Sequence, residues 1–135
     1  MWGVRYVFLL CLFMFACEKD QSPLSSESIS IIPTSMGAED FYTFKVVNNL
    51  DKILWYSGYQ EGSPIYATQI TSDTGWVYSG PGWCGTGLTK IAFGPGSSFS
   101  ISVLKPDTNR EWRVGIYFYT DYDDNGEYLW GRQIK

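Results

Sequence analysis

Few side chains of this chain could carry out catalysis, because its 135 residues include no histidine. The absence of histidine removes Ser-His-Asp and Cys-His catalysis, together with the usual ligand sets of zinc. The 14 Asp and Glu residues leave hydrolysis by a carboxylate pair formally open, but no pair stands out by its spacing. A small all-β domain also has little room for a substrate cleft. The sequence therefore predicts a protein that is not an enzyme.

Cys17 ends the first apolar segment of the chain. Arg5 is followed by an uninterrupted apolar run over residues 6–17, and then by the charged residues 18–20 (Glu-Lys-Asp). One positive charge before a short apolar run is typical of an export signal. The run is shorter than the ~20 residues that a helix needs to cross a bilayer. We therefore expect residues 1–16 to be a signal peptide rather than a permanent membrane span.

The residues just before Cys17 distinguish a secreted product from an anchored one. Ordinary signal peptidase needs small residues one and three positions before the cut, and Met14 fits that poorly. The stretch Met14-Phe15-Ala16-Cys17 resembles a bacterial lipobox, with less common residues at its first two positions. The resemblance implies a lipoprotein that is cleaved at Cys17 and acylated there, for example with palmitate. The alternative is an incidental cysteine of the apolar run, as Cys11 is expected to be.

The charged residues that follow Cys17 bear on the destination of the protein. Residues 18–20 resemble the acidic sorting signal of surface-exposed lipoproteins of the Bacteroidota. This resemblance implies a protein of the cell envelope, lipid-anchored to the outer membrane and either periplasmic or surface-exposed. Removal of Arg5 with the signal leaves 9 Lys and Arg against 14 Asp and Glu, a net charge of −5. Such a domain is a poor nucleic-acid binder, so we expect membrane association through the N-terminal lipid alone.

Cys84 lies in the Gly-rich stretch 79–87, next to Trp83. It is the only cysteine expected to remain as a free thiol once Cys11 leaves with the signal and Cys17 carries lipid. We expect Cys84 to be a small apolar residue buried under this loop, in a domain that holds together without a disulfide. The alternative is a reactive thiol or one that pairs between molecules, although no neighbouring base in the sequence supports it.

Asp121, Asp123 and Asn125 alternate in the stretch Asp-Tyr-Asp-Asp-Asn-Gly, which matches the first half of a calcium loop. The match then fails, because Arg132 occupies the position of the bidentate glutamate and no helices flank the loop. We favour a hairpin turn in which Asn125 and the following glycine adopt positive φ angles. No cofactor is expected, apart from a weak Ca²⁺ site as the alternative.

Aromatic residues crowd the first half of the expected domain. Adjacent residues of a strand point to opposite faces, so Trp55 and Tyr56 cannot both face one core. Exposed aromatic rings on a rigid sheet suit glycan stacking or protein contact, whereas packing between strands and anchoring of loops are the commoner uses. The candidate ligand-binding residues are Trp55, Tyr56, Tyr59, Trp76 and Trp83.

The elements that would position these residues are short strands separated by Gly, Pro, Asn and Asp. Residues 18–38 are rich in Ser and read as a flexible tether, although the isoleucines at 29, 31 and 32 could add an edge strand. No stretch has a sustained helical period. The predicted strands are residues 42–47, 53–59, 65–70, 76–78, 88–93, 99–104, 112–119 and 128–133.

Clean alternation marks two of these strands as half-buried. Phe99, Ile101 and Val103 share one face, and the apolar residues of 112–118 do the same opposite Arg113 and two tyrosines. Seven or eight such strands predict an all-β fold, an Ig-like antiparallel β-sandwich over residues 39–135, after the signal peptide 1–16 and the segment 17–38. Turns and alternation over residues 41–133 resemble small Ig-like domains of bacterial exported proteins, including the proteinase-inhibitor type.

These features together predict a membrane-anchored, non-enzymatic binding or structural module of the cell envelope, with a glycan or an envelope protein as its partner. One alternative is a proteinase-inhibitor-like domain that presents the loop 79–87. Another is a calcium-dependent adhesion or binding domain.

Overall fold

A computed structural model describes residues 24–123 and 125–135 of the chain. They form ten strands and one short 3₁₀ turn, η1 (Ala38–Asp40). Within these residues no helix is long and apolar enough to cross a membrane. The strands are β1 (Ile29–Met36), β2 (Phe41–Asn48), β3 (Leu54–Gln60), β4 (Ser63–Pro64), β5 (Tyr66–Ser72), β6 (Gly75–Gly80), β7 (Thr89–Phe93), β8 (Ser98–Leu104), β9 (Trp112–Tyr119) and β10 (Glu127–Trp130).

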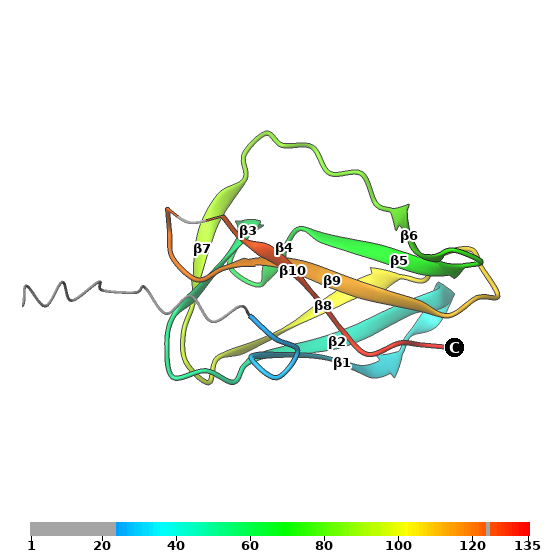
Figure 1. Cartoon of the computed structure of the whole chain (residues 1–135), viewed down its shortest axis with the longest axis horizontal. Helices are drawn as coiled ribbons and strands as arrows, with labels where there is room; N and C mark the ends of the chain where they lie inside the picture. The colour runs from blue at the N-terminus through cyan, green and yellow to red at the C-terminus, as the bar shows by residue number, and fades with distance from the viewer. Residues whose placement is uncertain (1–23, 124) are drawn as a thin grey trace, which may run out of the picture.

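The strands make an antiparallel β-sandwich, which confirms the predicted fold (Figure 1). The smaller sheet has the order β1-β2-β8. The larger has the order β4-β3-β9-β5-β6, and in addition β7 pairs with β3 and β10 pairs with β9. The chain crosses between the sheets after β2, after β7 and after β8, as in Ig-type sandwiches. These crossings place β9 in the middle of the larger sheet.

The core lies between the sheets and is built by alternation along β8 and β9. Trp112, Val114, Ile116 and Phe118 of β9 are completely buried, while Arg113 between them is only half-buried. In β8, Phe99, Ile101 and Val103 face the core, whereas the three serines and Leu104 are exposed. A strand with one face on a core and one in water requires this pattern, so the sequence-based assignment of these two strands is confirmed.

The first strand lies within the segment that the sequence suggested as a flexible tether. β1 pairs along its length with β2, and its side chains Ile29 and Ile31 are buried. Leu24, five residues earlier, is also buried in the core. The sandwich therefore includes residues from Leu24 onward, so residues 24–36 do not form the expected tether. Cys17 and the expected signal peptide, residues 1–16, lie outside the described residues.

Asn48 fixes the corner where the chain leaves the smaller sheet. Its side chain is fully buried, and its Nδ2 donates to the carbonyl oxygens of Lys52, Phe93 and Gly94 at 2.9, 2.9 and 3.1 Å. Its Oδ1 accepts a 3.0 Å hydrogen bond from the backbone N–H of Leu50. A buried amide with these partners joins the turn after β2 to the end of β7, so it ties the two sheets together.

Candidate functional site

The five aromatic residues proposed from the sequence as a ligand site lie in three different places. Tyr56 is in the core, with only 1% of its surface exposed and its ring 5.2 Å from that of Phe99. The choice of Tyr56 as a ligand-binding residue was therefore wrong. Its neighbour Trp55 lies on the opposite side of β3, which is the outcome that strand alternation requires.

The outer side of the larger sheet carries a continuous layer of aromatic rings. Tyr128 and Trp130 of β10 stack with ring centres 5.3 Å apart and planes inclined by 24°. Tyr117 of β9 meets Tyr128 edge-on at 5.1 Å, and the exposed Tyr78 of β6 lies 5.9 Å from Trp130. We call this the aromatic face, and define it as Trp76, Tyr78, Arg113, Tyr117, Tyr128 and Trp130.

Arg113 holds the aromatic face together. Its guanidinium carbon lies 4.1 Å from the ring centre of Trp76 and 4.8 Å from that of Trp130. Its Nε and Nη2 both donate to Oε1 of Gln69 on β5, at 3.0 and 2.8 Å. Burial lowers the pKa of this guanidinium, which nevertheless stays charged at neutral pH. A cation packed between two indoles fixes their positions before any ligand arrives.

Gly115 explains how Trp130 can lie so close to β9. A Cβ atom on Gly115 would be only 2.5 Å from the indole Cε3 of Trp130. The two residues are paired across the β9–β10 ladder, so the indole packs against bare backbone. The absence of a side chain at Gly115 is therefore needed for the close approach of the ring.

Trp55 lies on the same side of the larger sheet, toward its other end. Its ring meets that of Tyr122 edge-on, with centres 5.1 Å apart. Lys90 of β7 lies over the Tyr119 ring at 4.1 Å, and its Nζ donates to the backbone carbonyl of Tyr122. The aromatic layer thus continues beyond the aromatic face, with a second cation packed against a ring.

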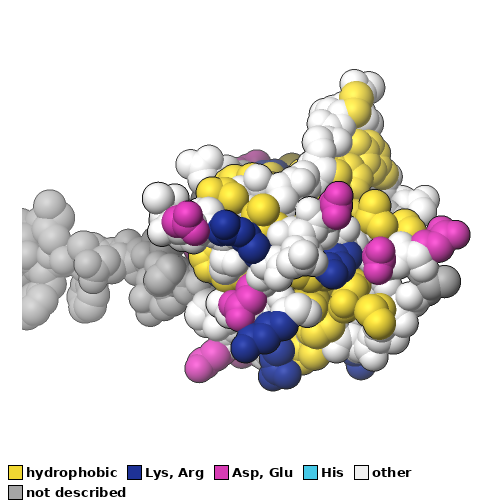
Figure 2. All heavy atoms as spheres, turned by 90° about the vertical axis from the view of Figure 1, so that its right-hand side faces the viewer, with side chains coloured by type: hydrophobic (Ala, Val, Ile, Leu, Met, Phe, Trp, Pro, Cys, Tyr) yellow, Lys and Arg dark blue, Asp and Glu magenta, His cyan; other side chains and the backbone are white. Residues whose placement is uncertain are grey.

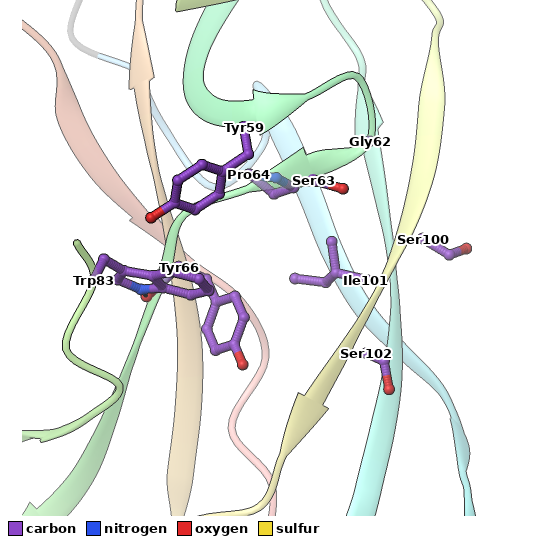
Figure 3. A pocket seen from close by; sticks show the side chains of 9 residues that line it. All are labelled: Tyr59, Gly62, Ser63, Pro64, Tyr66, Trp83, Ser100, Ile101 and Ser102. Carbon is purple, nitrogen blue, oxygen red and sulfur yellow. Dashed lines mark hydrogen bonds between the residues drawn. The ribbon is translucent and has the colours of Figure 1, made fainter. Parts of the chain in front are cut away.

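Tyr59 and Trp83 lie away from the aromatic face, at a groove between the sheets (Figure 3). The groove has a volume of about 310 Å³, and Tyr66 lines it beside them. Ile101 of β8 points across the groove toward these rings, while Ser100 and Ser102 point away (Figure 3). Burial raises the pKa of the Tyr66 phenol. Of the described residues that line this groove, none is charged.

The segment 79–87 begins with the last two residues of β6 and then arches away from the body of the sandwich toward β7 (Figure 1), and all of its residues are exposed. Two contacts hold it near its middle. The Trp83 indole donates to the backbone carbonyl of Tyr66, and the Tyr59 hydroxyl donates to the carbonyl of Cys84 at 2.6 Å. Trp83 therefore anchors the loop, which is one of the two roles that the sequence left open for these aromatics.

Cys84 is exposed, so the expectation that it is buried under the loop was wrong. Hydrogen bonds of the Trp83 indole and the Tyr59 hydroxyl hold the loop instead, and the Cys84 side chain remains exposed. Hydrogen bonds from Thr86, first from its side chain and then from its backbone, lower the pKa of the Cys84 thiol. The residue that lowers the pKa of the thiol is thus a threonine rather than a base, and its role was not apparent from the sequence.

The stretch around Asp121, Asp123 and Asn125 connects β9 to β10. Among the described residues, which leave out residue 124, no three His, Cys, Asp or Glu side chains are grouped closely enough to hold a metal. The Lys90 ammonium bonds a carbonyl of this loop, which disfavours a cation there. Gly126 does not have the expected positive φ; glycine is needed because a Cβ would collide with Tyr117.

Charge is not concentrated on the side of the molecule in Figure 2. Basic and acidic side chains alternate over this end, with hydrophobic side chains between them. Arg110 and Asp73 form an exposed ion pair at 3.4 Å. Aromatic surface, rather than charge, is therefore the feature that distinguishes the candidate sites.

Sequence reasoning missed most members of the aromatic face. Alternation already placed Arg113 and Tyr117 opposite the buried residues of β9, which was a usable signal. No comparable signal indicated that Tyr128 and Trp130 would stack beside them, because their strand is only four residues long. No protein-family model matches this chain, and no curated protein sequence matches it. Its function must therefore be inferred from these surfaces.

Proposed function

We propose that this protein is a non-enzymatic binding module of the cell envelope that holds a glycan on its aromatic face. The observation that carries the proposal is the placement of Arg113 between Trp76 and Trp130, with Tyr128 stacked beside them. Rings that are already fixed lose little conformational entropy when a ligand packs on them. Flat, rigid and partly exposed rings suit the apolar faces of sugar rings.

Anchoring through Cys17 is part of the same proposal. The lipobox-like residues before Cys17 and the short apolar run that ends there support it. Substitution of Cys17 by Ala should move the protein from the membrane fraction to the soluble fraction. Continued sedimentation of the Cys17→Ala protein with membranes would refute lipid anchoring.

Binding is tested with the purified full-length protein in detergent on an array of bacterial and plant glycans. Trp130→Ala and Trp76→Ala should each lose at least tenfold in affinity for any glycan bound, with their fold retained by circular dichroism. Trp83→Ala is the matched control, because it removes an indole that lies off the aromatic face. If no glycan on the array binds, but an envelope protein binds the native protein and not Trp130→Ala, the partner is a protein instead.

A second candidate is a proteinase-inhibitor-like domain, as the exposed and pinned loop 79–87 suggests. An inhibitory loop must be accessible and also held in one conformation, and the contacts of Trp83 and Tyr59 supply the second condition. A protease panel tests this function. Inhibition that is lost on changing the loop but kept in Trp55→Ala would favour it over glycan binding.

A further inference from the structure

The smaller sheet has two edge strands, β1 and β8, and they differ in how far their outward-facing backbone groups are shielded from pairing with another strand. The edge of β1 is covered, because the backbone N–H of Arg132 donates to the carbonyl of Ile31 at 3.3 Å. Pro33 lacks an N–H there, and the register with β2 shifts between Pro33 and Ser35. Proline, irregular pairing and a covering segment are the usual ways in which proteins block an edge.

Within residues 24–123 and 125–135, the edge of β8 has none of these devices. Its register with β2 is continuous from Ser98 to Leu104, and the strand contains no proline and no charged residue. Two backbone hydrogen bonds, one at each end of β8, show which of its residues bond to β2. The N–H of Asn48 donates to the carbonyl of Ser97, and the N–H of Lys105 donates to the carbonyl of Asp40. The residues of β8 that bond to β2 are the odd-numbered ones, since bonding alternates along an antiparallel pair.

The even-numbered residues of β8 therefore direct their backbone N–H and C=O groups away from β2. Within the described part of the chain, no strand pairs with this side of β8. Ser100 and Ser102 line the groove although their side chains point away from it (Figure 3), so their backbone forms its wall. An unpaired row of backbone donors and acceptors at strand spacing is complementary to another strand.

We propose that the edge of β8 binds an extended peptide segment of a partner protein, which adds a fourth strand to the smaller sheet. The segment would exchange backbone hydrogen bonds with Ser100 and Ser102. Side chains of paired strands share a face, so its residue opposite Ile101 points into the groove, toward Tyr66 and Trp83. The uncharged lining selects an apolar side chain at that position and polar ones on either side.

A peptide fits this groove better than a glycan does, because the wall is formed by regularly spaced backbone groups rather than by polar side chains. The volume of about 310 Å³ is at the small end of ligand pockets, which suits the anchoring of one large side chain. This site is separate from the aromatic face and does not depend on the proposed glycan binding.

The test uses full-length protein in detergent and capped seven-residue peptides of alternating Ser and Thr. Their central residue is Leu, Phe or Trp, with Asp as the control. Peptides with an apolar centre should shift the backbone amide resonances of Ser100 and Ser102 and bind at least tenfold more tightly than the Asp peptide. Ser102→Pro removes an N–H that β2 does not use, so it should lose this binding while Ser102→Ala keeps it.

Methylation of the peptide amides that face β8 gives a second test, which remains valid if Ser102→Pro does not fold. It should abolish binding, whereas methylation of the other amides should not. The proposal is wrong if no peptide shifts these resonances, or if Ser102→Pro and Ser102→Ala bind equally well. It is also overturned if an oligosaccharide occupies the groove instead, or if the edge pairs two copies of this chain in a dimer that Ser102→Pro dissociates.

Discussion

The guanidinium group of Arg113 lies over the Trp76 ring, with its central carbon 4.1 Å from the ring centre. The contact joins two strands that are not neighbours, since β5 runs between β9 and β6 in the larger sheet. Gln69 on β5 completes it by accepting both hydrogen bonds from Arg113. One arginine therefore connects three strands on the outer surface of the sheet.

Arg113→Lys should destabilise the domain, although the charge is kept. Lysine cannot make the paired hydrogen bonds to Gln69, and its compact ammonium stacks less well between two indoles. Cation–π contacts contribute about 0.5–2 kcal/mol, so we expect a loss of roughly 1–2 kcal/mol in urea unfolding. Arg110→Lys, at an exposed ion pair, should change the stability by less than about 0.5 kcal/mol. Equal effects of the two substitutions would contradict this role of Arg113.

Gly115→Ala should displace the Trp130 indole from β9. The added methyl group would lie 2.5 Å from the ring, and overpacking of this kind costs about 1–3 kcal/mol. A change in tryptophan fluorescence should accompany the fall in the unfolding midpoint. Gly82→Ala is the control, because a Cβ there has nothing within 4 Å and should leave both quantities nearly unchanged.

Asn48→Ala should be among the most damaging single substitutions in the domain. It removes the Asn48 side-chain partner of the Lys52 and Phe93 carbonyl oxygens and of the Leu50 N–H, all at a buried corner. Each unsatisfied buried group costs about 1–3 kcal/mol, so a total loss of roughly 3 kcal/mol or more is expected in chemical denaturation. The adjacent Asn49→Ala, whose hydrogen bonds are exposed, should cost about 1 kcal/mol at most.

The Cys84 thiol should react with alkylating reagents at lower pH than an ordinary cysteine. Hydrogen bonds from Thr86 stabilise the thiolate and lower the pKa of the thiol, so the rate should rise with a midpoint below its usual value. Thr86→Val removes the side-chain hydrogen bond and should move the midpoint upward. An unchanged profile in Thr86→Val would mean that the hydroxyl does not act on the thiol.

Stability should fall at strongly alkaline pH. Burial raises the pKa of Tyr56 and of Tyr128 above that of the unfolded chain. A group with a raised folded pKa keeps its full contribution below the unfolded pKa, about 10, and loses it as the pH rises through the folded value. The unfolding free energy should therefore drop above about pH 10, and Tyr56→Phe should reduce that drop. A drop of the same size in Tyr56→Phe would exclude this tyrosine as its source.

Much of the fold was predictable because β8 and β9 alternate without a break. Such a pattern determines which side of a strand is buried wherever it lies in the sheet. β1 was harder to predict, because its Ser-rich sequence with Pro33 has the composition of a linker. Its pairing with β2 and the burial of Ile31 make it a strand, and both depend on tertiary contacts that the local sequence does not show.

The candidate site was less predictable than the fold. Strand alternation showed that one of Trp55 and Tyr56 had to leave the core, but local sequence did not show which. Trp83 and Cys84 are neighbours in an irregular loop without alternation, so their orientations depended on contacts with Tyr59 and Tyr66. The prediction that Cys84 is buried failed for that reason.

The sequence by itself determined the all-β class, the inward faces of β8 and β9 and the lack of histidine chemistry, because these follow from residue type and a period of two. Only the tertiary structure placed Arg113 between Trp76 and Trp130, and only it shows that, among the described residues, Arg132 covers one edge of the smaller sheet while no strand pairs with the other. These features join residues far apart in the chain. Their positions depend on how the sheets twist and cross, which local periodicity does not encode.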